Sequence, residues 1–98
     1  MSEETIHEGA WAEWEEQQLM LRLACPEKVK LLPYAYLVEV TFEEPDHLKL
    51  EFSSCVVEIT GDGLDEMLPA LQEHRITWIQ MGSRIKEIKV SGTKRSND

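Results

Sequence analysis

The sequence lacks the features that mark a secreted or membrane-embedded protein. It has only two cysteines, Cys25 and Cys55, which are too few for a disulfide scaffold. No apolar run approaches the length of about 20 residues that a membrane-spanning helix needs. The first ten residues, MSEETIHEGA, contain no apolar stretch of the kind that forms the centre of a signal peptide. We therefore expect a cytoplasmic protein with free thiols, in which Cys55 is a small apolar residue of the core.

Basic residues are also scarce. Ten lysines and arginines stand against nineteen aspartates and glutamates, which gives a formal net charge of −9. Contacts with a nucleic-acid backbone or an anionic membrane need Lys and Arg to replace counterions, so the charge disfavours both partners. A basic stretch at residues 84–95, with five basic residues and Glu87, is where nucleic-acid binding would be sought. Residues 1–27 are acidic, with Arg22 alone against seven carboxylates, and this segregation of charge can steer two copies together.

Metal-binding motifs are absent from the sequence as well. His7, His47 and His74 lie far apart, and there is no HExxH, no CxxC and no pair of histidines at short spacing. A zinc site would have to be assembled from distant single residues. We therefore expect no metal ion and no cofactor.

Catalytic motifs are equally scarce. The GDG sequence at Gly61–Gly63 lies where a phosphate loop would lie, but it lacks a third glycine and a Lys-Ser/Thr pair, and Asp62 would repel a phosphate. Ser53, Ser54 and Cys55 are not part of a GxSxG elbow. The abundant carboxylates resemble solvated helix and turn surfaces. These observations favour a protein that is not an enzyme.

The length limits the fold to a single domain. A chain of 98 residues buries about two-thirds of its unfolded surface, which suffices for one core. Residues 1–9 are acidic and residues 91–98 are polar, with little to bury. We expect two flexible tails around one domain over residues 10–90.

The segment after the acidic tail has a composition typical of a helix. Residues 10–23 contain no Gly or Pro, and Trp11, Trp14 and Leu21 share one face at helical spacing. The alternation of Leu19, Leu21 and Leu23 also fits a strand, so residues 17–23 remain open between the two. We predict a helix that Pro26 ends, followed by a connector over residues 27–32.

Three alternating segments then predict an antiparallel meander over residues 34–42, 47–53 and 55–60. A turn at 43–47 brings the apolar residues of the first two segments onto one face. At Ser53-Ser54 the alternation slips, which indicates either a two-residue hairpin or a strand with a bulge. The predicted opposite pairs are Phe42–Leu48, Val40–Leu50, Val38–Phe52, Phe52–Cys55, Leu50–Val57 and Leu48–Ile59.

A second helix and one or two further strands complete the prediction. Residues 64–74 have apolar residues at helical spacing, with Pro69 predicting an irregular opening turn. Residues 76–81 alternate again, and a right-handed crossover would place them parallel to residues 55–60 in the same sheet. An outer strand over 84–90 follows. The predicted fold class is therefore α+β: an N-terminal helix, a three-stranded meander, a helix packed on one sheet face, then one or two strands.

Trp11 and Trp14 are the candidate interface residues. Tryptophan is costly to expose and common at the centres of interfaces, so the two rings either close the core or dock on another subunit. We hypothesise a small non-enzymatic module that binds protein and self-associates as a homodimer.

The alternative hypothesis is a small-molecule binding protein or a small enzyme. Its site would lie where the Gly61–Gly63 turn meets Tyr34, Tyr36 or Ser54. The sequence identifies no particular ligand or partner.

Overall fold

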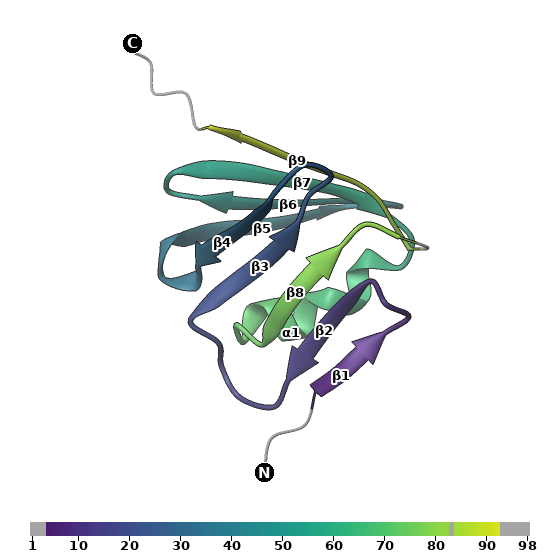
Figure 1. The fold of residues 1–98 in the computed structure, drawn as a ribbon, viewed down its shortest axis with the longest axis horizontal. Helices are drawn as coiled ribbons and strands as arrows, with labels where there is room; N and C mark the ends of the chain where they lie inside the picture. The colour runs from purple at the N-terminus through teal and green to yellow at the C-terminus, as the bar shows by residue number, and fades with distance from the viewer. Residues whose placement is uncertain (1–3, 83, 93–98) are drawn as a thin grey trace.

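Residues 4–82 and 84–92 are described by a computed structural model of the chain. In this part of the chain, nine strands form two sheets beside one short helical segment (Figure 1). Sheet A has five strands in the order β1-β2-β8-β3-β4, and sheet B has four in the order β5-β6-β7-β9. The protein is mostly β, so the predicted α+β arrangement of an N-terminal helix, a meander and a packed helix is wrong.

Sheet B contains the predicted meander. Its strands are β5 (Leu37–Glu43), β6 (His47–Phe52) and β7 (Cys55–Gly61), with β9 (Ile85–Gly92) as the predicted outer strand beside β7. All neighbouring strands run antiparallel, and the turn at Ser53-Ser54 is a hairpin. Four predicted opposite pairs are confirmed: Phe42–Leu48, Val40–Leu50, Leu50–Val57 and Leu48–Ile59.

The start of the meander differs from the prediction. Tyr34–Tyr36 form a single 3-10 turn, η1, which carries the chain from sheet A into sheet B. The register of β5 then shifts between Leu37 and Glu39, so Leu37 rather than Val38 pairs with Phe52. This irregularity reverses the phase of the alternation. Val38 is consequently 68% exposed instead of facing the core.

Sheet A replaces the predicted N-terminal helix. Residues 10–23 contain β2 (Trp11–Trp14) and most of β3 (Met20–Ala24), so the first segment is a strand and the open choice over residues 17–23 resolves as a strand from Met20 onward. Part of the expected acidic tail, β1 (Glu4–His7), pairs antiparallel with β2. The helix propensity of this segment is overridden by long-range strand pairing, which local composition does not encode.

The remaining strands of sheet A come from one segment that the sequence analysis predicted to be a connector and one that it predicted to join the meander. Most of the expected connector over residues 27–32 is β4 (Val29–Pro33), which pairs antiparallel with β3. Pro33 is its last residue, and an edge strand tolerates proline because one side of its ladder is unpaired. β8 (Ile76–Gln80) is the predicted strand, but it crosses to sheet A, where it lies parallel to β3 and not to β7.

The helical segment between β7 and β8 begins with a 3-10 turn, η2 (Leu64–Met67), and continues as α1 (Leu68–Gln72). The predicted irregular opening turn before Pro69 is confirmed. In Figure 1 this segment lies behind β8 and β2, on the inner side of sheet A. The helical segment therefore encloses the core together with both sheets. The sequence predicted instead that this segment alone covers the meander.

One apolar core lies between the two sheets and the helical segment. Both sheets contribute alternate residues of their strands, as the period of two requires. Cys55 belongs to this core, as predicted. The largest fully buried side chains are Trp11, Phe52, Leu21, Leu23, Leu48, Leu50, Ile59, Leu64, Met67, Leu71, Ile76 and Ile79.

The C-terminal strand extends further than the sequence predicted. β9 continues to Gly92, so the first two residues of the expected polar tail belong to a strand. The rest of that tail and residues 1–3 lie outside the described residues. Within the described ranges, no helix has the length and apolar character needed to cross a membrane.

Candidate functional site

Sheet A turns one face to the core and the other to solvent. The strand registers place one outward row across all five strands, in which Arg22 is the charged member. From β1 to β4 the row runs Ile6, Ala12, Trp78, Arg22 and Leu31. We call the outward side chains of β8, β3 and β4 the outer face of sheet A. Besides Trp78, Arg22 and Leu31, this face contains Gln80, Ala24, Val29, Met20 and Pro33.

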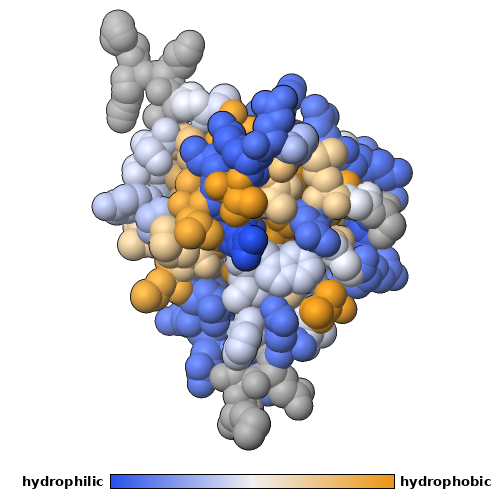
Figure 2. Space-filling model, in the orientation of Figure 1, coloured by the Kyte–Doolittle hydropathy of each residue, from blue (hydrophilic) through white to orange (hydrophobic). Residues whose placement is uncertain are grey.

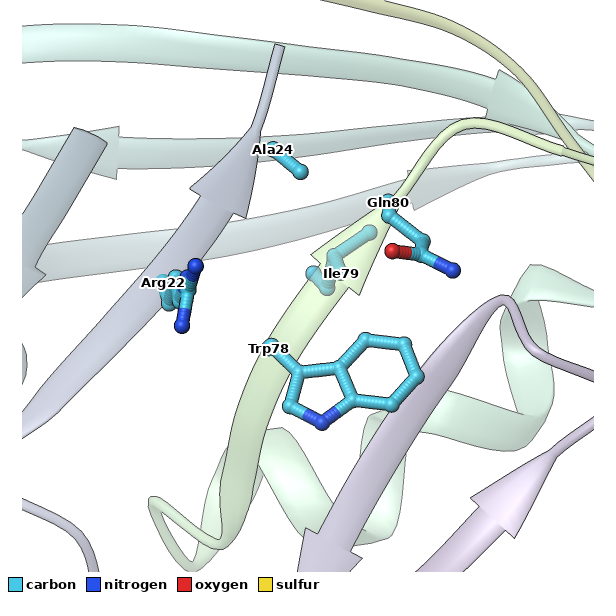
Figure 3. Close-up of a pocket in the computed structure, with 5 residues that line it drawn as sticks. All are labelled: Arg22, Ala24, Trp78, Ile79 and Gln80. Carbon is cyan, nitrogen blue, oxygen red and sulfur yellow. The ribbon is translucent and has the colours of Figure 1, made fainter. Parts of the chain in front are cut away.

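A hollow of about 230 Å³ lies on this face between β3 and β8. Figure 3 shows Arg22 on β3 and Trp78 and Gln80 on the neighbouring strand β8, with the Trp78 ring and the Gln80 amide extending toward β2, away from Arg22. Ala24 and Ile79 complete the lining. The Trp78 indole is held in place because its Nε1 donates a hydrogen bond to Glu4 Oε2 at 3.2 Å. Arg22 therefore supplies a cationic group that can bind a carboxylate on one side of the hollow, and Trp78 supplies an aromatic surface on the other.

Three of the exposed large apolar side chains, Met20, Val29 and Leu31, lie on this face of β3 and β4. The described residues include eight such side chains, and six of them come from residues 19–38. Figure 2 shows the apolar colour gathered left of centre, where Figure 1 places β3 and β4. Contiguous apolar surface of this kind marks interaction sites in soluble proteins. The six are Leu19, Met20, Val29, Leu31, Tyr36 and Val38.

The same stretch reverses the charge of the chain. Residues 19–38 contain Arg22, Lys28 and Lys30 against Glu27 alone, although the whole chain carries −9. Among the described residues, none of these three cations forms an ion pair, whereas Arg84 is paired with acidic side chains. This stretch is therefore apolar and locally positive on an otherwise acidic protein, with Arg22 on the outer face and Lys30 on the opposite side of the sheet.

The two predicted interface residues, Trp11 and Trp14, differ from this surface in being buried and half-buried. Trp11 is fully buried and belongs to the core, where its ring stacks on His7 at a centroid distance of 5.2 Å. Its Nε1 is buried without an acceptor among the described residues. Trp14 is half-buried on the same strand, two positions beyond Ala12. In this structure Trp11 thus offers no surface to a partner.

The Gly61–Gly63 turn is filled by Arg84. The Arg84 guanidinium donates to the carbonyl oxygen of Asp62 at 3.2 Å and to that of Gly63 at 3.0 Å. Gly63 has a left-handed backbone with φ of 67°, where a residue without Cβ is favoured. A side chain, rather than open space, therefore occupies the place where the sequence suggested a ligand site.

Tyr36 and Ser54 lie at the far end of β7 from the Gly61–Gly63 turn, where the Ser53 N–H donates to the Tyr36 carbonyl at 2.8 Å. Ser54 precedes β7 and Gly61 ends it, so they lie about 20 Å apart along the strand. Tyr34 is buried, and its hydroxyl donates a hydrogen bond of 2.7 Å to the carbonyl of Ile76. Burial raises the pKa of Tyr34 and this hydrogen bond lowers it by less. Tyr34 is thus a structural group, and Tyr36 is exposed at the turn that follows it.

The histidines serve separate contacts. His7 Nε2 lies 2.7 Å from Glu13 Oε2, and His47 lies within 3.5 Å of two carboxylates. His74 stacks on Tyr34 at 4.6 Å. Over residues 4–82 and 84–92, no three His, Cys, Asp or Glu side chains converge in a geometry that could hold a metal ion.

The sequence analysis did not single out Arg22 or Trp78. Arg22 was noted only as the single basic residue among residues 1–27, and Trp78 was treated as one residue of an alternating strand. They become neighbours only because β3 and β8 pair in parallel, with Arg22 opposite Trp78. The useful signal was the alternation over residues 20–23. In β3 the side chains of Met20 and Arg22 are exposed, and those of Leu21 and Leu23 are buried.

Comparisons of the chain with protein-family models, with curated proteins and with solved structures gave no match.

Proposed function

We propose that this protein is a small cytoplasmic, non-enzymatic module that binds another protein through the outer face of sheet A. The carrying observation is that the exposed apolar side chains Met20, Val29 and Leu31 lie on the same sheet face as Arg22 and the hollow that it lines. Trp and Arg are enriched among the residues that dominate interface energies, and a surrounding apolar rim excludes water from them. The free thiols of Cys25 and Cys55 are consistent with a reducing compartment.

A second copy of the chain and an acidic partner protein are the two candidate partners. In a homodimer built face to face, the unpaired cations of both copies would be brought close together and would repel. An acidic partner on the outer face would instead neutralise Arg22. The surface charge therefore favours a different, acidic protein, although two copies can still associate through unlike surfaces.

The small-molecule alternative has weaker support. The hollow beside Arg22 is lined by five residues of an exposed sheet face, and the turn at Gly61–Gly63 is filled by Arg84. Small-molecule sites usually bury most of their ligand between converging elements. An open sheet face is better suited to a protein partner.

Two substitutions on the outer face test the proposal. Arg22→Glu reverses the charge in the hollow, and Leu31→Asp places a charge on the apolar rim. Lys49→Glu is the matched control, because Lys49 lies on β6 in the other sheet. The wild-type chain is used to recover a partner, the partner is purified, and its affinity for each variant is measured by calorimetry. Analytical ultracentrifugation of the wild-type chain alone measures self-association.

We expect Arg22→Glu and Leu31→Asp each to weaken binding about tenfold or more, because charge reversal or a buried unpaired carboxylate costs several kcal/mol at an interface. Lys49→Glu should leave the affinity nearly unchanged. Thermal denaturation of each variant checks that it is folded. Equal affinity in all four proteins, or a chain that is monomeric and binds no protein, would overturn the proposal.

A further inference from the structure

β4 has one strand neighbour, β3, so its other side is an open edge of sheet A. Two backbone hydrogen bonds flank the β3–β4 ladder. The Cys25 N–H donates to the Lys28 carbonyl at 2.9 Å, and the Tyr34 N–H donates to the Leu19 carbonyl at 3.0 Å. These bonds fix which residues of the hairpin exchange hydrogen bonds, because bonded and non-bonded pairs alternate along an antiparallel ladder.

The alternation assigns the backbone groups of β4. Lys30 and Leu32, at even steps from Lys28, direct their backbone groups toward β3. Val29 and Leu31 therefore direct their N–H and C=O groups toward the open edge, where no described strand accepts them. Pro33 adds a carbonyl but no N–H. The edge thus offers two donors and three acceptors in a row.

The edges of sheet B carry more of the features that prevent further strand pairing than β4 does, which carries Lys30 and ends at Pro33. β5 carries Glu39 and Glu43, and β9 carries Lys86 and Lys89, and each of these strands has a register shift. Charged residues and bulges are the usual means by which proteins prevent further strand pairing. On β4 the side chains beside the open backbone groups are Val29 and Leu31, which are 52% and 56% exposed.

The charges around β4 indicate the chemistry of an added strand. Lys30 lies between Val29 and Leu31 and projects to the opposite side of the sheet. Among the described residues, Lys30 and its neighbour Lys28 have no ion pair. A strand laid along this edge would place apolar side chains beside Val29 and Leu31 and a carboxylate beside Lys30. Opposite charges across a strand pair stabilise it.

A second copy of β4 fits this edge poorly. A two-fold pairing centred on Lys30 places the two Lys30 side chains directly opposite each other, and like charges there are destabilising. A two-fold pairing centred on Leu31 brings Val29 opposite Pro33, which has no N–H to donate. Neither symmetric register satisfies both charge and hydrogen bonding.

We propose that the open edge of β4 receives an extended segment of an acidic partner protein as an added strand, with the order apolar, acidic, apolar opposite Val29, Lys30 and Leu31. This inference rests on the proposed function and specifies the form that its partner takes. Main-chain hydrogen bonds to Val29 and Leu31 supply affinity, and Lys30 selects the acidic residue.

Defined peptides test this inference on the intact chain. The probe is a capped seven-residue peptide of alternating valine and glutamate. One control peptide has lysine in place of glutamate, and a second has its alternate amides N-methylated so that it cannot pair as a strand. Amide hydrogen exchange of the protein is followed residue by residue by NMR. We expect the acidic peptide to slow exchange at the Val29 and Leu31 amides, and the lysine peptide to bind about tenfold more weakly because its charges repel Lys30 and Lys28.

Two protein variants sharpen the test. Leu31→Pro deletes one outward N–H and leaves the ladder to β3 intact, because Leu31 does not bond to β3. Lys30→Glu should reverse the preference from the glutamate peptide to the lysine peptide. Thermal denaturation checks both folds, and the N-methylated peptide gives the same information on the unmodified protein should Leu31→Pro fail to fold.

Three results would overturn the inference. The N-methylated peptide could bind as well as its parent, or the acidic peptide could shift Trp78 and Arg22 resonances without protecting Val29 and Leu31. This second result would support the outer face as a binding surface but would exclude strand addition at β4. Protection of Val29 and Leu31 that grows with protein concentration, without peptide, would assign the edge to a second copy instead.

Discussion

The guanidinium carbon of Arg84 lies 4.4 Å from the centroid of the buried Trp11 ring. The same guanidinium donates to the carbonyls of Asp62 and Gly63, so one side chain joins the start of β9 to β2 and to the turn after β7. We predict that Arg84→Ala lowers the free energy of unfolding by about 2 kcal/mol, from the lost cation–π contact and charged hydrogen bonds. Urea denaturation measures this change.

Lys86→Ala is the matched control for Arg84. Lys86 also carries one positive charge near the same turn, but its contact with Asp62 is 3.6 Å long and its side chain is 59% exposed. An exposed ion pair of this kind contributes about 0.5 kcal/mol or less. Equal losses for Arg84→Ala and Lys86→Ala would show that the Trp11 contact and the two carbonyl hydrogen bonds of Arg84 together contribute no more than an exposed ion pair.

Gly61 and Gly82 form a second matched pair. A Cβ on Gly61 would overlap the backbone carbonyl oxygen of Arg84, which cannot move without displacing β9 from β7. We predict that Gly61→Ala costs about 2 kcal/mol, as overpacking does in cores, and lowers the melting temperature by about 10 °C. Gly82→Ala should change it little, because nothing lies within 4 Å of the added Cβ. Circular dichroism on heating separates the two, and similar melting temperatures would contradict the close approach.

The meander could be predicted from sequence because its pairings are local. Leu48, Leu50, Val57 and Ile59 repeat with period two on either side of short turns, so matching their apolar faces fixes the register. The same reasoning failed for β8, whose partners β2 and β3 lie more than fifty residues earlier in the chain. Alternation identifies a strand, but it does not say which sheet the strand joins.

The candidate site could not be predicted from the sequence for the same reason, because its residues meet only through long-range strand pairing. Trp11 and Trp14 fit helical spacing and also fit a strand with a register shift beside Ala12, and only pairing with β8 decides between them. Arg22 and Trp78 become neighbours through the parallel pairing of β3 with β8. A binding surface that spans several strands is a property of the sheet order, so residues on it carry no motif of their own.

Glu13 is predicted to matter more than its neighbour Glu73. Glu13 accepts a hydrogen bond from Arg75 at 3.1 Å through one oxygen and contacts His7 at 2.7 Å through the other, and its side chain is 18% exposed. Glu73 also binds Arg75, at 2.7 Å, but is 63% exposed. We predict that Glu13→Ala costs about 1–2 kcal/mol and Glu73→Ala about 0.5 kcal/mol or less in chemical denaturation. The reverse order would show that the shorter, exposed contact dominates.

Tyr34→Phe tests the buried hydroxyl that joins η1 to β8. The substitution leaves the Ile76 carbonyl without its side-chain donor, so we predict a loss of about 1–2 kcal/mol at neutral pH. Stacking on His74 should survive, because phenylalanine keeps the ring. Denaturation at pH 7 measures the loss, and a variant as stable as the wild type would mean that the hydrogen bond contributes nothing net.

The pH dependence of that difference has a definite sign. Burial raises the pKa of Tyr34 in the folded state above its ordinary value of 10.0, which the unfolded chain retains. Above about pH 10 the unfolded state therefore releases a proton that the folded state holds, and stability falls as the pH rises. Tyr34→Phe has no such proton, so its deficit relative to the wild type should shrink between pH 9 and about pH 11. Paired urea titrations at those two pH values measure the deficit, with all other titrating groups common to both proteins. A deficit that stays constant or grows would mean that the Tyr34 hydroxyl ionises as readily in the folded chain as in the unfolded one.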